Sequence, residues 1–181
     1  MQTLLKFSQA IDKITDRLGQ ASAFCVVLTI AIGFYNVVAR YLGRFIGVKL
    51  TSNLFIELQW YLFSLTFLLG FSYVLKHGLN VRVDFLYTNW SAKTKAWVDL
   101  IGHTLFLTAF CIIGLYVTTH PVLQSWGQLP DGTFGTWELS PDPDGLPRAP
   151  IKSMMLVAFG MLFLQTISEI IKNIAIIKGE S

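Results

Sequence analysis

Residues 18–38 read LGQASAFCVVLTIAIGFYNVV and contain no charged side chain. A membrane-spanning helix needs about 20 consecutive, mainly apolar residues to cross a hydrocarbon core about 30 Å thick. A membrane strand would instead show alternating polarity over about 10 residues, whereas this run is apolar on all sides over a greater length. The stretch therefore predicts a transmembrane helix, which satisfies its own backbone hydrogen bonds in lipid.

Three further apolar runs follow, at about 55–75, 96–118 and 151–171. Of the 181 residues, 53% are hydrophobic and 14% are charged, whereas soluble proteins carry about 25% charged residues. We predict an all-α membrane protein with four transmembrane helices, in which residues 18–175 form a four-span domain and 176–181 a cytoplasmic tail. The scattered net charge of +3 does not indicate nucleic-acid binding.

Residues 1–17 are amphipathic. At helical spacing, apolar side chains fall on one face and polar ones on the other: Leu4, Phe7, Ile11, Ile14 and Leu18 against Lys6, Gln9, Asp12, Lys13 and Asp16. The pattern predicts an amphipathic N-terminal helix that lies at the membrane interface or packs on a partner. A simple extension of the first span is the alternative. No small-x-small cleavage site follows the apolar run, so we expect the first span to be retained.

The distribution of lysine and arginine predicts the orientation in the membrane. Nine of these residues lie in the N-terminal segment, the second loop and the C-terminal tail, and five lie in the first and third loops or at their edges. We therefore expect both termini to be cytoplasmic and residues 119–150 to form an outer, periplasmic loop. Arg40 and Arg44, which follow the first span, argue the other way.

The third loop contains all six prolines, no lysine, and four acidic residues: Asp131, Glu138, Asp142 and Asp144. Pro130-Asp131-Gly132 predicts a turn, and the residues from Thr133 to Leu139 could form a short hairpin. Aromatic side chains disfavour disorder, so we expect an ordered flap. Its aromatic residues would pack down on the membrane face, and its acidic residues would face outward.

The second loop predicts a short helix lying along the cytoplasmic interface. Apolar and charged residues alternate after Asn80, and Ser91 is suited to cap the helix that leads into the third span. Lys93 and Lys95 would face lipid headgroups.

Ionisable residues near the spans are candidates for function because a charge in lipid is costly. Glu57 could serve as the carboxylate of a small multidrug pump, but it lies too near the end of its span, and a polar contact between helices is favoured. Asp99 with His103, and Gln165 with Glu169, are spaced four residues apart and can pair locally.

Cofactor chemistry finds little support in the sequence. A haem anchor would need paired histidines inside the bundle, and His103 has no partner at its depth. Cys25 and Cys111 lie on separate spans without metal-ligand spacing. We expect no cofactor, no metal site and no enzymatic activity.

Five short motifs occur in order along the four spans: Glu57-Leu-Gln59-Trp60-Tyr61, Gly70-Phe-x-Tyr73, Asn80-Val-Arg82-Val-Asp84, Trp137-Glu138-Leu-Ser140-Pro and Gln165-Thr-Ile-Ser-Glu169. Together they resemble the small membrane subunit of tripartite ATP-independent periplasmic (TRAP) transporters. The resemblance implies a scaffold subunit that packs against a large permease subunit carrying the substrate and sodium sites. It also implies a periplasmic binding protein that delivers a small organic acid, in the inner membrane of a bacterium or archaeon.

The resemblance carries over no catalytic residues. As candidates for contact with the large subunit or with membrane lipids we select Glu57, Gln59, Trp60, Arg82, Asp84, Trp137 and Glu138. Residues 119–150 would either dock the binding protein or cover the seam between the membrane subunits. Two other functions remain open at this point: a self-sufficient four-helix efflux transporter and the membrane anchor of a redox complex.

Overall fold

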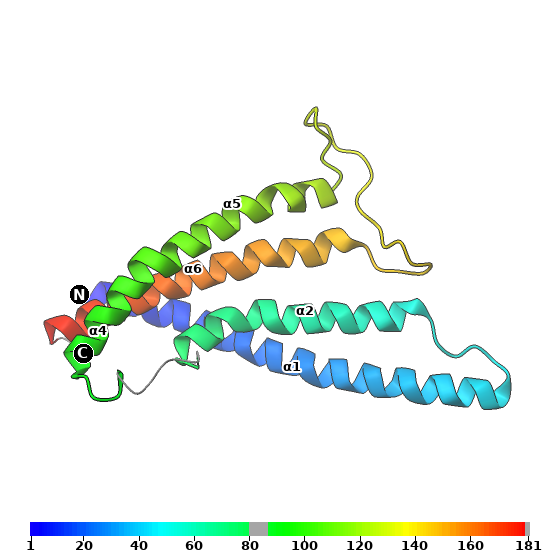
Figure 1. The fold of residues 1–181 in the computed structure, drawn as a ribbon, viewed down its shortest axis with the longest axis horizontal. Coiled ribbons are helices and arrows are strands. Elements are labelled where there is room, and N and C mark those ends of the chain that lie inside the picture. The colour runs from blue at the N-terminus through cyan, green and yellow to red at the C-terminus, as the bar shows by residue number, and fades with distance from the viewer. Residues whose placement is uncertain (80–86, 180–181) are drawn as a thin grey trace. The chain divides into compact units, whose positions relative to one another are not determined.

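The computed structural model of the chain describes residues 1–79 and 87–179. Its helices, shown in Figure 1, are α1 (Gln2–Ile46), α2 (Asn53–Lys76), α4 (Ala92–Ile101), the π-helix η1 (Gly102–Leu107), α5 (Thr108–Ser125) and α6 (Arg148–Lys178). The described residues contain no strand, only one antiparallel bridge between Gln128 and Phe134. Four helical stretches are long and apolar enough to cross a membrane, which confirms the predicted all-α class.

Helix α1 runs without a break from the amphipathic N-terminal segment through the first predicted span. It ends at Gly47, whose φ of 71° is the left-handed conformation that glycine adopts readily. The amide of Val48 donates to the carbonyl of Gly43 at 3.0 Å, the bond that closes a Schellman cap. The segment 1–17 is therefore continuous with the first span rather than a separate helix.

The third span is one continuous stretch built from α4, η1 and α5. Ser91 caps its start as predicted, because its hydroxyl accepts a hydrogen bond from the amide of Thr94 at 3.2 Å. In η1 the wider π-turn leaves carbonyls that side chains can reach, and the hydroxyl of Thr108 donates to the carbonyl of His103 at 2.9 Å. The stretch continues past Pro121 to Ser125, beyond the predicted end of the span.

The chain divides into two compact units, which we describe separately. The terminal unit comprises Met1–Gly19, Phe71–Val117 and Val157–Ser181, and the loop unit comprises Gln20–Gly70 and Thr118–Leu156.

In the terminal unit, small residues bring the helices close together. Leu75, Cys111 and Leu162 form a buried apolar cluster contributed by α2, α5 and α6. Gly114 lies directly against the ring of Phe159 on α6, so that a β-carbon at this position would overlap the ring. Small residues at helix contacts are typical of membrane bundles, where close backbone approach provides the packing energy.

In the loop unit, α1 and α2 lie against each other, and the connection from α5 to α6 folds over residues of α2. The hydroxyl of Ser22 donates to the carbonyl of Thr66 at 2.7 Å, and the rings of Tyr35 and Phe55 lie 5.1 Å apart. The long connection appears in yellow in Figure 1. These contacts hold α2 against α1, and α2 carries the residues that contact the loop.

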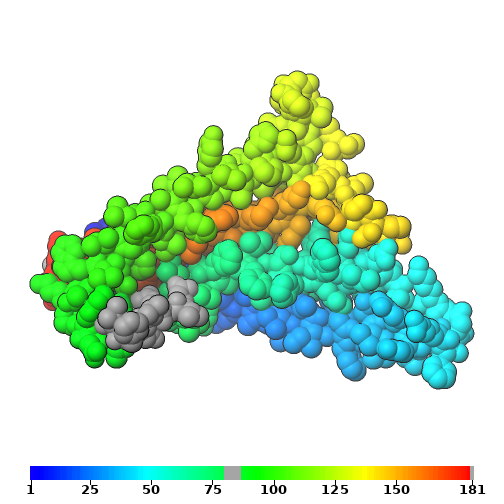
Figure 2. All heavy atoms as spheres, in the orientation of Figure 1, coloured from blue at the N-terminus to red at the C-terminus, as the bar shows by residue number. Residues whose placement is uncertain are grey.

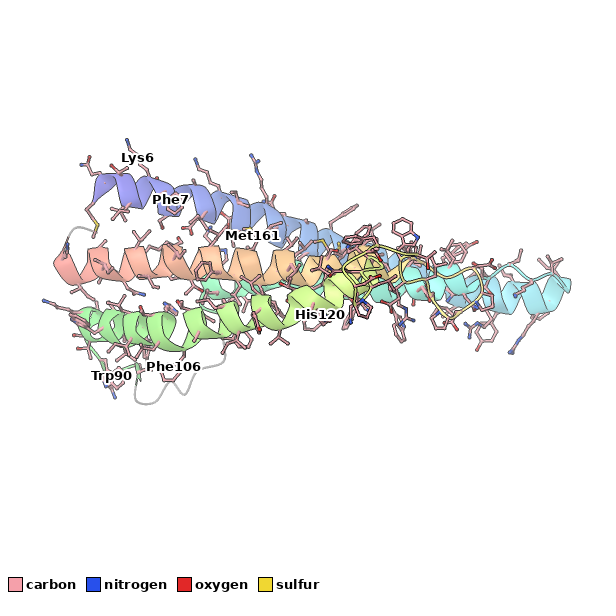
Figure 3. All side chains as sticks on the ribbon, turned by 90° about the horizontal axis from the view of Figure 1, so that it is seen from above. Lys6, Phe7, Trp90, Phe106, His120 and Met161 are labelled. Atoms are coloured by element: carbon pink, nitrogen blue, oxygen red, sulfur yellow. The ribbon has the colours of Figure 1, made fainter. Side chains whose placement is uncertain are left out.

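Bulky apolar side chains cover the outside of the helices, whereas the buried set is rich in small and polar residues. Phe106 and Tyr116, which belong to the third span, are 75% and 83% exposed. Figure 2 shows side chains of α5, in green, on the surface of the molecule, and Figure 3 labels Phe106 among the outward side chains of the helices. This arrangement suits a surface that meets lipid or another membrane protein rather than water.

Candidate functional site

A carboxylate on α2 holds the long loop in place. Glu57 is 8% exposed and accepts hydrogen bonds from the hydroxyl of Ser140 and from the amide of Leu146. One turn further along α2, the hydroxyl of Tyr61 donates to the carbonyl of Pro147 at 2.5 Å. We call these five residues the loop latch. The sequence indicated a polar contact for Glu57 with another helix, but its partners lie in the loop.

Gly145 allows the latch to close. A β-carbon at this position would overlap the side chain of Ser140 and approach a carboxylate oxygen of Glu57 at 2.8 Å. A side chain at residue 145 would therefore displace Ser140 and Glu57 where the loop backbone approaches α2.

The same loop is also attached to α6. Glu138 forms an ion pair with Lys152, and its backbone amide donates to the carbonyl of Ser125 at 2.8 Å. The indole nitrogen of Trp126 donates to the hydroxyl of Ser153 at 2.8 Å. The hydrogen bond and charge of Lys152 hold the pKa of Glu138 below its usual value, and the positive charge of Arg148 acts in the same direction.

The predicted turn at Pro130–Gly132 is present, and a short hairpin flanks it. The amide of Leu129 donates to the carbonyl of Thr133 at 2.8 Å, and Asp131 accepts hydrogen bonds from the hydroxyl and amide of Thr133. The pairing continues through the bridge between Gln128 and Phe134 to the amide of Gly135, which donates to the carbonyl of Gly127 at 2.8 Å. It ends before Glu138, whose amide bonds to the end of α5.

The aromatic residues of the loop pack on the chain only in part. The rings of Trp126 and Trp137 lie 5.6 Å apart, whereas Phe134 and Leu139 are 64% and 62% exposed. The acidic residues also divide. Asp131, Asp142 and Asp144 are exposed, as expected, but Glu138 is turned to Lys152. Exposed apolar side chains on a latched loop leave a surface that is suited to a partner.

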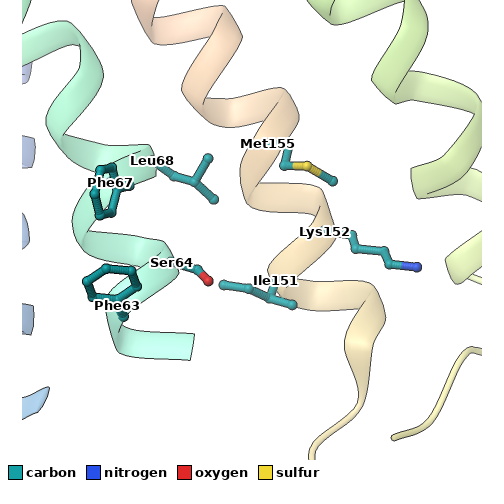
Figure 4. A pocket seen from close by; sticks show the side chains of 7 residues that line it. All are labelled: Phe63, Ser64, Phe67, Leu68, Ile151, Lys152 and Met155. Atoms are coloured by element: carbon teal, nitrogen blue, oxygen red, sulfur yellow. The ribbon is translucent and has the colours of Figure 1, made fainter. Parts of the chain in front are cut away.

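A hollow of about 410 Å³ lies next to this loop, between α2 and the start of α6 (Figure 4). Its walls are mainly apolar and include Phe63, Phe67, Ile151 and Met155. Lys152 also borders it, but Figure 4 shows this side chain directed away from α2, and its ammonium group is paired with Glu138. The hollow therefore offers a seat for apolar groups and no free charge for a polar substrate.

In the terminal unit, a second carboxylate joins α1 to α6. Asp12 accepts hydrogen bonds from Gln165 at 3.0 Å and from Ser168 at 2.9 Å, and its other oxygen lies 2.8 Å from the ammonium nitrogen of Lys172. Glu169 completes the group by accepting from both Gln165 and Lys172. We call these five residues the polar cluster. The predicted pairing of Gln165 with Glu169 is confirmed, at 2.9 Å.

Further polar contacts extend this seam along the N-terminal part of α1. The hydroxyls of Ser8 and Ser168 lie 2.7 Å apart, and the hydroxyl of Thr15 donates to Gln165 at 2.7 Å. Lys76 from α2 forms an ion pair with Asp16 at 2.5 Å.

The buried side of residues 1–17 is neither the polar nor the apolar face that the sequence defines. Ser8, Ile11 and Thr15 are buried. The exposed and half-exposed positions include polar and apolar residues alike: Lys6, Gln9, Lys13, Leu4, Phe7 and Ile14. In lipid an unpaired polar group is costly, so the hydroxyls of Ser8 and Thr15 turn inward to partners on α6.

The remaining predicted candidates occupy varied environments. Trp60 is 69% exposed, whereas Gln59 points its amide nitrogen into a buried position near Gly33 without a hydrogen-bond acceptor in the described residues. Arg82 and Asp84 lie outside the described residues.

Two candidates in the third span contact side chains from outside their own helix. Asp99 accepts a hydrogen bond from the hydroxyl of Tyr87 at 2.7 Å, and His103 lies 3.5 Å from the side-chain amide of Asn173.

The polar groups that the structure assembles act as cross-links between segments. Glu57, Glu138 and Asp12 each accept from donors that hold a loop or a helix, and within residues 1–79 and 87–179 no three His, Cys, Asp or Glu side chains are placed to hold a metal ion. Only Ser91 and Gln165 were assigned their partners from sequence, because both bonds are local. The long-range partners of Asp12 and Glu57 carried no signal in a single sequence.

Comparison with known proteins identifies the family. A family model described as "Tripartite ATP-independent periplasmic transporters, DctQ component" matches residues 29–175. Comparison with curated proteins and with solved structures gives no match. Because the family match covers 147 of the 181 residues, including all of the three later predicted spans, the chain belongs to the DctQ family, the small membrane subunits of tripartite ATP-independent periplasmic transporters, a transporter component and not a family of enzymes.

Proposed function

We propose that the chain is the scaffold subunit of a sodium-driven transporter that imports a small organic acid across the inner membrane of a bacterium or archaeon. In this proposal a large permease subunit binds the substrate and sodium, and a periplasmic binding protein delivers the substrate. Both termini of the chain are cytoplasmic, and residues 119–150 lie on the periplasmic face.

The observation that carries this proposal is how little of the apolar surface the chain covers by itself. Only 6% of the apolar window of the third span is buried within the chain, and 11% of that of the second. Meanwhile Asp12, Glu57 and Glu169 are all engaged in hydrogen bonds within the chain. A chain with large uncovered apolar faces and no free intramembrane carboxylate among these three suits packing against a carrier better than carrying an anion itself.

The fixed loop supports a role at the seam between the membrane subunits. The loop latch and the Glu138–Lys152 pair hold the loop to α2 and α6, while Phe134 and Leu139 remain exposed. Apolar side chains on a rigid support favour packing against the large subunit. The exposed carboxylates Asp131, Asp142 and Asp144 favour the second candidate role, encounter with the binding protein through complementary charge.

The proposed contacts with partners and lipids involve Gln59, Trp60, Trp137 and the pair Arg82 and Asp84. Trp60 and Trp137 are exposed and can fill pockets on a partner. Arg82 and Asp84 would hold the interfacial segment of the second loop, so Arg82→Ala should reduce assembly without preventing membrane insertion.

Replacement of residues 130–144 by a Gly/Ser linker of equal length tests the role of the loop. A seam-covering loop predicts that the small and large subunits no longer co-purify in detergent. A docking loop predicts an intact membrane complex that needs more binding protein for the same uptake. Normal assembly and normal uptake by the linker variant would contradict both roles.

Deletion of the gene tests the proposed function as a whole. The large subunit should then be unstable or inactive, and uptake should be lost until the chain is supplied again. Full uptake in the deleted strain would contradict a scaffold role.

A further inference from the structure

A hollow at the C-terminal end of α1 gathers three basic side chains without an acidic one. Its volume is about 310 Å³, and it is lined by Arg40, Arg44 and Lys49 together with small and apolar residues of the segment 39–51. None of the three cations forms an ion pair or a side-chain hydrogen bond with the described residues. We call this feature the cationic hollow.

Two glycines shape the cationic hollow. Gly47 reverses the chain at the end of α1, and the segment after it folds back over the last turns of the helix. At Gly43 a β-carbon would lie 2.5 Å from the carbonyl oxygen of Val48 and 3.5 Å from the amide nitrogen of Leu50. The absence of a side chain at Gly43 therefore lets Lys49 approach the face that carries the two arginines.

The position of the hollow along α1 places it at the level of lipid headgroups. Residues 18–39 carry no charge, and at 1.5 Å per residue they span about 33 Å, close to the thickness of the hydrocarbon core. Arg40 is the first charged residue beyond this run, and Arg44 lies about 6 Å further along the axis, within a headgroup layer of about 5–8 Å.

The apolar surface below the hollow is suited to acyl chains. Phe34, Val37 and Tyr41 recur at helical spacing on α1 and are exposed, with Phe34 72% exposed. Arg44 continues the same face one turn beyond Tyr41, so that an apolar stripe leads up to the basic side chains.

We propose that the cationic hollow binds an anionic phospholipid, with the phosphate held by Arg40, Arg44 and Lys49 and the acyl chains lying along Phe34, Val37 and Tyr41. Guanidinium groups bind phosphate oxygens through two parallel hydrogen bonds, and an ammonium group adds a third donor. A basic side chain in the last turn also complements the helix dipole. The interaction with the helix dipole explains a basic residue at position 44, but it does not explain why Lys49, which lies outside the helix, lines the same hollow.

The test measures lipid binding to the purified full-length chain in detergent. The chain is titrated with phosphatidylglycerol, and native mass spectrometry detects the bound lipid. The variant Arg40→Gln/Arg44→Gln/Lys49→Gln should bind phosphatidylglycerol at least about tenfold more weakly than the wild type. The matched control Lys6→Gln/Lys13→Gln/Lys178→Gln loses the same charge from exposed positions elsewhere and should bind as the wild type does. Gly43→Ala keeps every charge but displaces the segment 48–50, and it should also weaken binding.

Two further arms identify the source of the phosphate. Phosphatidylcholine, which has the same phosphate and chains but no net charge, should bind more weakly, and inorganic phosphate should not displace phosphatidylglycerol. The proposal is overturned if the triple variant and the control bind phosphatidylglycerol equally, or if inorganic phosphate displaces it. It is also overturned if the triple variant loses retention of the periplasmic binding protein while its lipid binding stays unchanged. Because lipid binding is read directly, these results are independent of whether the chain supports transport.

Discussion

In both the polar cluster of the terminal unit and the loop latch of the loop unit, a carboxylate joins two segments of the chain, but the joined segments and the donors differ. In the polar cluster, Asp12 joins two helices through side-chain donors that include the ammonium group of Lys172. In the loop latch, Glu57 joins a helix to an irregular loop through a hydroxyl and a backbone amide.

The difference lies in what is lost when the carboxylate is removed. Without Asp12, a cation and two polar side chains of α6 lose an acceptor, whereas without Glu57 only neutral donors of the loop do. Hydrogen bonds to charged groups contribute more than neutral ones. Most bulky apolar side chains of this chain lie on its outside, so burial of apolar surface does little to specify which segments pack together. The polar contacts specify this instead.

The largest expected effect is that of Asp12→Ala. It should lower the free energy of unfolding by about 2–3 kcal/mol, because the ammonium group of Lys172 loses its partner on α1. Unfolding in increasing SDS, followed by circular dichroism, measures this change.

Asp16→Ala is the matched control, since Asp16 lies one turn away, is 42% exposed and also pairs with a lysine. Its effect should be much smaller than that of Asp12→Ala, because ion pairs at an exposed surface contribute little. An equal loss of unfolding free energy in the two variants would show that the polar cluster stabilises the fold no more than an exposed ion pair does.

Glu57→Ala should release the loop without unfolding the helices. The amide of Leu146 and the hydroxyl of Ser140 lose their acceptor, at a cost of about 1–3 kcal/mol. Cleavage of the loop by an added protease should therefore become at least about tenfold faster, with Glu57→Gln intermediate. Asp144→Asn, an exposed carboxylate of the same loop, serves as the control and should leave the cleavage rate as it is.

Gly145→Ala tests the same latch through its shape and should have a smaller effect, about 1 kcal/mol, because Ser140 and Glu57 can shift to admit a methyl group. Gly135→Ala is the control in the same loop, where a β-carbon would meet its nearest neighbours at ordinary contact distances of 3.8 and 3.9 Å. Similar protease sensitivity of both variants would argue against close approach at Gly145.

The smallest effect concerns pH. The pKa of Glu138 is below its usual value because of Lys152, so the pair stabilises the folded loop above the carboxyl's ordinary pKa and loses this contribution as pH falls through the lowered value. The fluorescence of Trp126 and Trp137 should report a transition on acidification below about pH 4. In Glu138→Gln this transition should be missing, and an unchanged titration curve would assign it to other groups.

The sequence predicted the four spans and their helical type, because a mainly apolar run of about 20 residues has few other structures available to it in lipid. It also predicted the Ser91 cap and the Gln165–Glu169 pair, which depend only on neighbours along one helix. The role of residues 1–17 was less accessible. The buried side, with Ser8, Ile11 and Thr15, follows neither face of the amphipathic pattern, because it depends on bonds from Ser8 and Thr15 to residues of α6 that lie far away in the sequence.

The loop shows the second limit. Pro130-Asp131-Gly132 predicted its turn, but Glu57 is more than 80 residues from Ser140 and Leu146, and nothing local to Glu57 specifies a loop partner. A hairpin from Thr133 to Leu139 was predicted from the turn sequence, yet its pairing reaches only Gly135, and the amide of Glu138 bonds to Ser125 instead.

The most direct test of the central claim, that this chain completes another subunit rather than transporting by itself, is reconstitution in proteoliposomes with an imposed sodium gradient. The large subunit and the binding protein should give uptake only when this chain is included, and this chain with the binding protein alone should give none. Full uptake without this chain, or uptake by this chain without the large subunit, would contradict the account.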